Sequence, residues 1–286
     1  SFSDILEPGE MVVQPEEKPA ATRIAEHEKT THQLREVLDI SDRITVIRRG
    51  KVVGSTKPQE ADQSKLAEMM VGRPVDLVLE KEPSKPTDMV LSVKDLVVAN
   101  QLNQVAVEDL CFDVFRGEVL GVAGVQGNGQ TELVEAITGL CNVQSGSIQL
   151  MGTEISNVSP RVITELGSGH IPEDRQRDGL VLNFPVKDNL ILNMYYQAPF
   201  AKGIQMHWDE ALKNADGLIE DFDIRTPNAE TKAGALSGGN QQKVIVAREL
   251  SRPLNFLVAS QPTRGLDVGS IEYIHKQILR RRDEGV

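Results

Sequence analysis

The chain has little cysteine, no excess of positive charge and no long apolar run. Its 286 residues include only two cysteines, Cys111 and Cys141, without metal-ligand spacing, so we expect packing roles in a reducing compartment. The net charge of -11 predicts no basic face for nucleic-acid phosphates, so nucleic acid is not expected as a partner. No run approaches the roughly 20 apolar residues that span a bilayer. These absences predict a cytosolic chain that reaches a membrane only through a partner.

The apolar pattern divides this globular chain, 40% hydrophobic, into two units. In the first, residues 1–78, the stretch 31–74 is typical of a helix, a hairpin and a short helix, whereas 1–30 shows little periodicity. The charged, proline-containing stretch 79–88 is a candidate linker. The second unit, 89–286, alternates strands, a glycine-rich loop and helices, which predicts an α/β fold.

The glycine-rich loop GVQGNGQT follows an apolar run, GEVLGVAG, that we expect to be a buried strand. Glycines let backbone N–H groups cradle phosphates, and the phosphate-loop pattern adds a lysine and a hydroxyl. Gln130 replaces the lysine, so binding is expected without charge neutralisation during phosphoryl transfer. The candidate nucleotide-binding residues are Gly124, Gly127, Asn128, Gly129, Gln130 and Thr131. The Thr131 hydroxyl is also a candidate Mg2+ ligand, and a purely structural strand-to-helix turn is the alternative for this loop alone.

The octapeptide LSGGNQQK, residues 236–243, places a serine and two glycines at the start of an apolar helical pattern. Unpaired N–H groups and the helix dipole favour an anion there, although Ser-Gly-Gly alone is also an ordinary helix cap. The complete octapeptide resembles the signature motif of ATP-binding cassette (ABC) proteins, in the form typical of importers for simple sugars and nucleosides. The resemblance implies a P-loop NTPase-type fold with an antiparallel β subdomain and a helical signature subdomain. It also implies that ATP contacts Ser237, Gly238, Gly239 and Gln241.

The stretch FLVASQPTRGLDVGS resembles the family's strand that ends in Asp-Glu-Pro-Thr, where Asp acts on magnesium and Glu polarises the attacking water. Ser260 and Gln261 stand at these positions, and Asp267 matches an aspartate that contacts ATP. Serine coordinates magnesium poorly and glutamine cannot accept a proton, so Ser260 is a weak Mg2+ candidate and Gln261 a degenerate catalytic position. HIPEDR resembles the family's Q-loop and implies that Glu173 contacts nucleotide; a solvated acidic turn is the alternative without the other motifs.

The segment THQLREVLDISDRITVIRRGKVVG resembles the end of a cassette, which implies that His32 is the switch histidine at the terminal phosphate of ATP. Upstream, ILEPGEMVVQPEE matches the family poorly, and Glu7 is not assigned as a site. The resemblance therefore covers the end of a first cassette and most of a second, degenerate cassette. We expect the chain to be a fragment that stops before the second cassette's switch region.

The residues around Gln-Pro-Thr-Arg-Gly-Leu-Asp are most similar to the nucleoside branch of the family. This resemblance implies an ABC-type ATPase subunit that couples ATP hydrolysis to import, with cassettes paired head to tail. The second cassette would supply its signature in trans to the competent site, while its own half-site turns over little. The implied partners are ATP with Mg2+, integral-membrane permease subunits and, indirectly, a periplasmic or lipoprotein substrate-binding protein, at the cytoplasmic face of the membrane. A non-catalytic nucleotide-binding module and a non-functional truncated product remain open alternatives.

Overall fold

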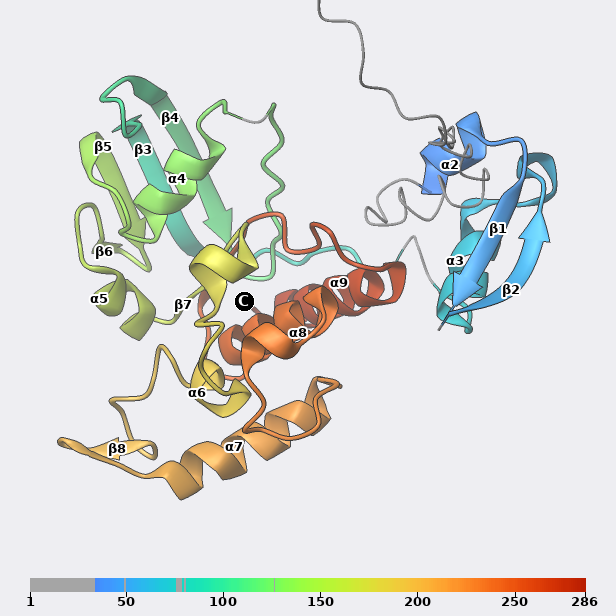
Figure 1. Ribbon diagram of the computed structural model, residues 1–286. Helices are drawn as coiled ribbons and strands as arrows, with labels where there is room; N and C mark the ends of the chain where they lie inside the picture. Colours follow the sequence, from blue (N-terminus) through green and yellow to red (C-terminus); the bar gives the residue numbers. More distant parts are fainter. Residues whose placement is uncertain (1–33, 49, 76–78, 80, 126) are drawn as a thin grey trace, which may run out of the picture. The chain divides into compact units, whose positions relative to one another are not determined.

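The computed structural model describes residues 34–48, 50–75, 79, 81–125 and 127–286. These residues form two compact units that divide after Val75 (Figure 1). The predicted switch residue His32 and the stretch 1–30 lie outside the described residues.

The first unit is a hairpin packed against two helices. Its elements are α2 (Leu34–Ile40), β1 (Ile44–Arg48), β2 (Lys51–Thr56), the short 3-10 helix η2 (Pro58–Glu60) and α3 (Gln63–Val71). The two strands pair antiparallel, and Ile44 and Val46 of β1 pack with Leu66 of α3 in a small core. The helix, hairpin and second helix that the sequence predicts are confirmed.

The second unit begins with an antiparallel sheet of four strands in the order β4-β3-β5-β6 (Figure 1). The strands are β3 (Met89–Ala99), β4 (Val105–Phe115), β5 (Val143–Leu150) and β6 (Thr153–Glu154). Helix α4 (Gln130–Ile137) packs on this sheet, and its Leu133 joins Leu91, Leu96 and Ile148 in one apolar core. The short helix α5 (Pro160–Glu165) follows.

The rest of the second unit is a parallel strand pair surrounded by helices. β7 (Ser168–Ile171) pairs in parallel with β10 (Phe256–Ala259). Between these strands the chain forms the π-helical turn η3 (Arg175–Gly179), α6 (Val186–Leu190), β8 (Ala201–Lys202), β9 (Gln205–Met206), α7 (Trp208–Asp221), the short 3-10 helix η4 (Ala233–Ala235) and α8 (Gly238–Leu250). Helix α9 (Val268–Asp283) follows β10. Every residue from Gln241 to Leu250 is buried, which is typical of a helix in the centre of a core. None of the helices that the structure describes is long and apolar enough to cross a membrane.

The prediction of a buried strand for GEVLGVAG is wrong. This segment has no regular secondary structure, and Val119, Leu120 and Val122 are 54%, 43% and 60% exposed. Its composition suits a strand, but a strand also needs a neighbouring edge with which to form hydrogen bonds. Within the described residues, the segment pairs with none of the strands.

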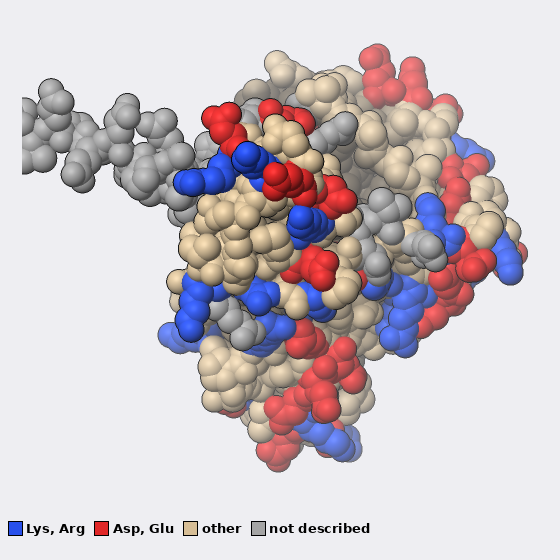
Figure 2. Space-filling view, turned by 90° about the vertical axis from the view of Figure 1, so that its right-hand side faces the viewer, with Lys and Arg blue, Asp and Glu red and all other residues tan. Residues whose placement is uncertain are grey.

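Charged side chains of both signs are interspersed on the face shown in Figure 2. Ion pairs such as Arg177–Asp178, with side chains 77% and 43% exposed, are well hydrated. Such exposed pairs stabilise a protein by only about 0–1 kcal/mol each. The polar interactions that stabilise the second unit most are therefore the buried ones.

Candidate functional site

The predicted signature residues lie at the start of the buried helix α8. Ser237 is the exposed N-cap residue, with extended backbone, and its side chain makes no capping hydrogen bond. Instead, its Oγ accepts a hydrogen bond from Asn240 Nδ2 at 3.0 Å. The first N–H groups of the 13-residue helix are thus left without a side-chain cap. Together with the helix dipole, they favour an anion such as a phosphate.

Asp267 begins helix α9 beside the start of α8. Its carboxylate accepts hydrogen bonds from Ser270 N at 2.9 Å and from Ser270 Oγ at 2.7 Å, so it caps α9. A Cβ atom on Gly239 would lie 2.7 Å from Ser270 Oγ and 3.2 Å from an Asp267 carboxylate oxygen. The structure therefore brings two predicted site residues together, and only glycine fits between the helix ends.

The side chain of Gln241 is directed into the protein. It is 2% exposed, its Nε2 donates to the carbonyl of Ala233 at 3.2 Å, and its Oε1 accepts from Gln176 Nε2 at 3.0 Å. These hydrogen bonds hold α8 against its surroundings. The predicted contact of Gln241 with ATP stays a prediction.

Glu173 and Gln261 meet across the ends of β7 and β10. Gln261, at a backbone φ of +43°, donates from Nε2 to Glu173 Oε1 at 3.1 Å. The same oxygen accepts a hydrogen bond from Arg264 Nη1. Arg264 is not among the predicted site residues, although it lies within the motif FLVASQPTRGLDVGS. Ser260, one residue before Gln261, is half-buried, and its N–H donates to the carbonyl of Ile171 at 2.9 Å. Two side chains of the segment after β10 thus converge on one oxygen of Glu173.

The phosphate-type loop is built around a left-handed turn at the start of α4. Gly129 has a φ of +90°, and a Cβ atom there would overlap the carbonyl of Ala106, so this position requires glycine. The Gln130 amide folds back onto Gly124, where it would overlap any added Cβ atom. Gly127, Asn128 and Thr131 are exposed. Beside the loop, a cleft of about 390 Å³ is lined by Ala99, Asn100, Gln101, Leu102, Thr131, Glu132, Glu135 and Cys141.

The structure does not join this loop to the residues after β10. Among the described residues, no hydrogen bond connects the loop 124–131 with Ser260 or Gln261. Thr131 and Ser260, the predicted Mg2+ ligands, are neutral hydroxyls, whereas Mg2+ prefers carboxylates and substrate phosphates. In the described parts of the chain, no cluster of three or more His, Cys, Asp or Glu residues could hold a metal ion. These side chains alone therefore do not fit a Mg2+ ion.

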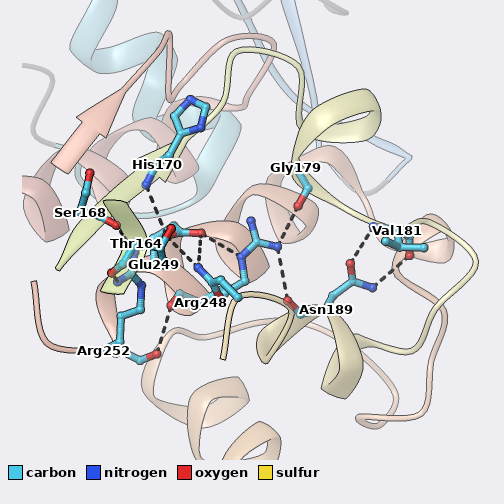
Figure 3. A network of polar contacts seen from close by, with 11 residues as sticks. Thr164, Ser168, His170, Gly179, Val181, Asn189, Arg248, Glu249 and Arg252 are labelled. Carbon is cyan, nitrogen blue, oxygen red and sulfur yellow. Dashed lines mark hydrogen bonds and ion pairs between the residues drawn. The ribbon is translucent and has the colours of Figure 1, made fainter. Parts of the chain in front are cut away.

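Glu249 of α8 lies at the centre of a buried polar network (Figure 3). Its side chain is 4% exposed and pairs with Arg248 Nε at 2.9 Å and with Arg252 Nη2 at 3.2 Å. It also accepts from Asn193 Nδ2 at 3.1 Å and from the backbone N–H of His170 at 3.4 Å. One carboxylate thus compensates two buried guanidinium groups, as buried charges require.

The two arginines extend this network to neighbouring elements. Arg248 Nη1 donates to the carbonyl of Gly179 at 2.8 Å, and Arg252 donates to the carbonyl of Ser168 (Figure 3). Burial lowers the pKa of the nearby His170 imidazole. The network therefore fixes α8, with its exposed N-terminal serine, against β7 and the segment before α6.

Known proteins share this sequence pattern. Residues 107–264 match a family model described as ABC transporter. The nucleoside import ATP-binding protein NupA of Lactococcus lactis subsp. cremoris is 50% identical over 255 residues, which are 89% of this chain and 50% of NupA. The guanosine import ATP-binding protein NupO of Bacillus subtilis is 48% identical over 246 residues, 86% of this chain and 48% of NupO. A glucose import ATP-binding protein of Haloferax volcanii, TsgD13, is 41% identical, and the match covers 89% of this chain and 47% of that protein. The chain thus spans about half the length of these relatives.

Solved structures share the fold. A nucleotide-free ATP-binding cassette from an ABC transporter aligns with a TM-score of 0.59 at 22% identity, over 70% of this chain and 79% of that one. A dimeric cassette bound to ADP and Pi aligns with a TM-score of 0.58 at 20% identity, over 68% and 83%. The predicted α/β cassette fold, with its antiparallel β part and its helical part, is confirmed. Since the family model covers more than half of its residues, the chain belongs to the ABC transporter family.

Proposed function

We propose that the chain is an ATP-binding, energy-coupling subunit of an importer for nucleosides. The observation that carries the proposal is the start of α8, where Ser237 and two glycines leave N–H groups uncapped on a helix fixed by a buried ionic network. ATP binding closes a pair of cassettes, hydrolysis reopens it, and the motion passes to integral-membrane permease subunits.

The two kinds of nucleotide contact on this cassette have different tasks in the proposal. In head-to-tail pairing, Ser237, Gly238 and Gly239 face ATP that is held by the phosphate loop of another cassette, which is the competent site. The cassette's own half-site, with Gln130 and Gln261, binds nucleotide and turns it over slowly. Gln130 carries no charge for the phosphates, and Gln261 cannot accept a proton from water. Mg2+ would be held there mainly by the nucleotide's own phosphates.

The substrate assignment rests on the relatives. The two that are about half identical carry names for nucleoside and guanosine import, whereas the one named for glucose import is 41% identical. We therefore assign nucleosides rather than simple sugars. The chain would work at the cytoplasmic face of the membrane, and a periplasmic or lipoprotein substrate-binding protein would act with it only indirectly.

One observation favours a second candidate, a nucleotide-binding module without catalysis. Glu173 is engaged by both Gln261 and Arg264, and Gln261, at the position of the catalytic base, cannot itself accept a proton from water. This candidate predicts that nucleotide binds and that no pairing produces hydrolysis.

ATP hydrolysis by the chain mixed with a cassette that carries an intact phosphate-loop lysine separates the two candidates. We expect hydrolysis to appear on mixing and Ser237→Arg to abolish it, because a bulky cation then occupies the phosphate position. Ser251→Arg, the same substitution at the exposed C-cap of α8, is the matched control and should leave activity unchanged. Full activity of Ser237→Arg, combined with near-complete loss in Gln130→Ala, would refute the proposed division of tasks.

Uptake of labelled nucleoside and labelled glucose tests the substrate. Cells whose importer carries Ser237→Arg should lose nucleoside uptake and keep glucose uptake, and Ser251→Arg should affect neither. The opposite selectivity would replace nucleosides by sugars in the proposal.

A further inference from the structure

Arg175 lies between the start of α8 and the loop that follows β10. It is the first residue of η3, and its Nη1 donates to the carbonyl of Arg264 at 2.9 Å. A Cβ atom on Gly238 would lie 2.8 Å from its Nη2, and one on Gly265 would lie 3.9 Å from the same group. One planar guanidinium thus contacts both segments.

Glu173, two positions before Arg175, contacts two side chains of the same loop. Glu173 pairs with the Arg264 guanidinium and accepts from Gln261, while Arg175 binds the Arg264 backbone. The loop from Gln261 to Gly265 contains two positive φ angles, +43° and +66°, at its ends. It belongs to no helix or strand, and these contacts connect it to the segment from Glu173 to Arg175.

We propose that Arg175 is a positioning residue that couples the two nucleotide sites to which this cassette contributes. This inference rests on the proposed function, in which the Gln261 loop belongs to the cassette's own site and Gly238 belongs to the competent site. A shift of the loop when nucleotide binds would move Arg175 and, through its contact with Gly238, the phosphate-binding end of α8.

The strengths of the contacts decide which part moves. The Arg264 side chain is 54% exposed, and an ion pair so exposed is weak, so an incoming phosphate can compete with Glu173 for Arg264. Arg175 is more enclosed, and its buried Nε has no hydrogen-bond partner among the residues that the structure describes. An unsatisfied buried donor raises the energy of the resting arrangement and favours a shift that gives it an acceptor. Lysine cannot replace this group, because one ammonium does not reach two partners in the planar geometry of a guanidinium.

Amide hydrogen exchange of the whole chain tests the coupling with a non-hydrolysable ATP analogue as the probe. In the wild type, the analogue should slow exchange in the loop 124–131 and also in the segment 236–242. Arg175→Gln should keep the first response and lose the second. Arg175→Lys should keep fold stability yet also lose the second response. Arg177→Gln is the matched control, because Arg177 is exposed and, within the described parts of the chain, its ion pair is with its neighbour Asp178.

The same variants without nucleotide give an independent readout. Arg175→Gln should speed exchange in 236–242 and in 263–266 about fivefold, as expected for the loss of one ordinary hydrogen bond, and Arg177→Gln should not. A wild type that shows no response at 124–131 refutes nucleotide binding, and the nucleotide-free comparison then still decides the role of Arg175. Unchanged exchange in the free Arg175→Gln protein, a second response that survives in Arg175→Gln or in Arg175→Lys, or a wild type that responds at 124–131 alone overturns the coupling.

Discussion

Replacing Glu249 by glutamine removes one negative charge from the buried network that fixes α8 and keeps the size of the side chain. Arg248 and Arg252, with side chains 8% and 6% exposed, then share a buried site without a carboxylate. Breaking a buried ion pair by removing one partner destabilises a protein by about 3–5 kcal/mol, because the remaining charge is neither hydrated nor paired. We expect Glu249→Gln to lower the free energy of unfolding by an amount in this range.

Urea unfolding, followed by circular dichroism and by the fluorescence of Trp208, measures this loss. The midpoint should fall while the dependence on urea stays the same, which marks a change of stability alone. In a domain of this size, the expected loss lowers Tm by roughly 6–20 °C. Glu284→Gln is the control, because Glu284 pairs with Arg280 and Arg281 but its side chain is 40% exposed. This substitution should change stability by about 1 kcal/mol or less.

A loss below about 1 kcal/mol for Glu249→Gln would refute the reasoning, because it would mean that water reaches the two guanidinium groups or that the network relaxes around an amide. Equal losses in Glu249→Gln and Glu284→Gln would refute it as well, since burial would then make no difference.

Three further predictions concern pH, backbone and thiol chemistry. Burial lowers the folded-state pKa of His170, so around and below pH of about 6.5 the unfolded chain binds more protons than the folded one; the free energy of unfolding should fall as the pH drops through about 6.5, less steeply in His170→Gln. Gly127→Ala should lower stability by about 1–2 kcal/mol through left-handed strain, and Gly129→Ala by clearly more, since its Cβ also overlaps a carbonyl; urea unfolding compares them. Burial raises the pKa of Cys141 to about 11, so at pH 8 its thiolate is about 100-fold scarcer than in an ordinary thiol, and a thiol reagent followed by mass spectrometry should label exposed Cys111 first.

Local pattern was sufficient to predict the elements that carry the candidate site. Gly129 precedes an apolar helical repeat and occupies the N-cap position of α4, and Ser237 precedes another and occupies the N-cap position of α8, because the start of a helix depends on a few neighbouring residues. The strand at Phe256–Ala259 follows from its continuous apolar run. GEVLGVAG has a similar run and forms no strand, because pairing depends on a partner edge that composition does not reveal.

Contacts between distant segments could not be predicted from the sequence. Arg264 and Glu173 are separated by 91 positions, and the motif around each residue gives no indication that they pair. Gln241 lies within the signature octapeptide, which associates it with ATP, yet its amide is bonded to Ala233 and Gln176 inside the protein. A motif shows which residues occur together in a family, whereas burial and tertiary hydrogen bonds decide where each side chain points.

The pairing of Glu173 with Arg264 changes how the missing charges of the proposed half-site are understood. Sequence alone shows a site without its lysine and its two carboxylates, which suggests weak attraction for phosphate. The structure adds Arg264, which contacts the same Glu173 oxygen as Gln261 and is paired with this carboxylate, whose side chain is 29% exposed. Phosphates that displaced this carboxylate would gain a charge-assisted partner, while Gln261 would still be unable to take a proton from water. In the proposed half-site we therefore expect binding and catalysis to separate: Arg264 offers phosphates a charged partner, whereas Gln261 cannot supply the base that hydrolysis requires.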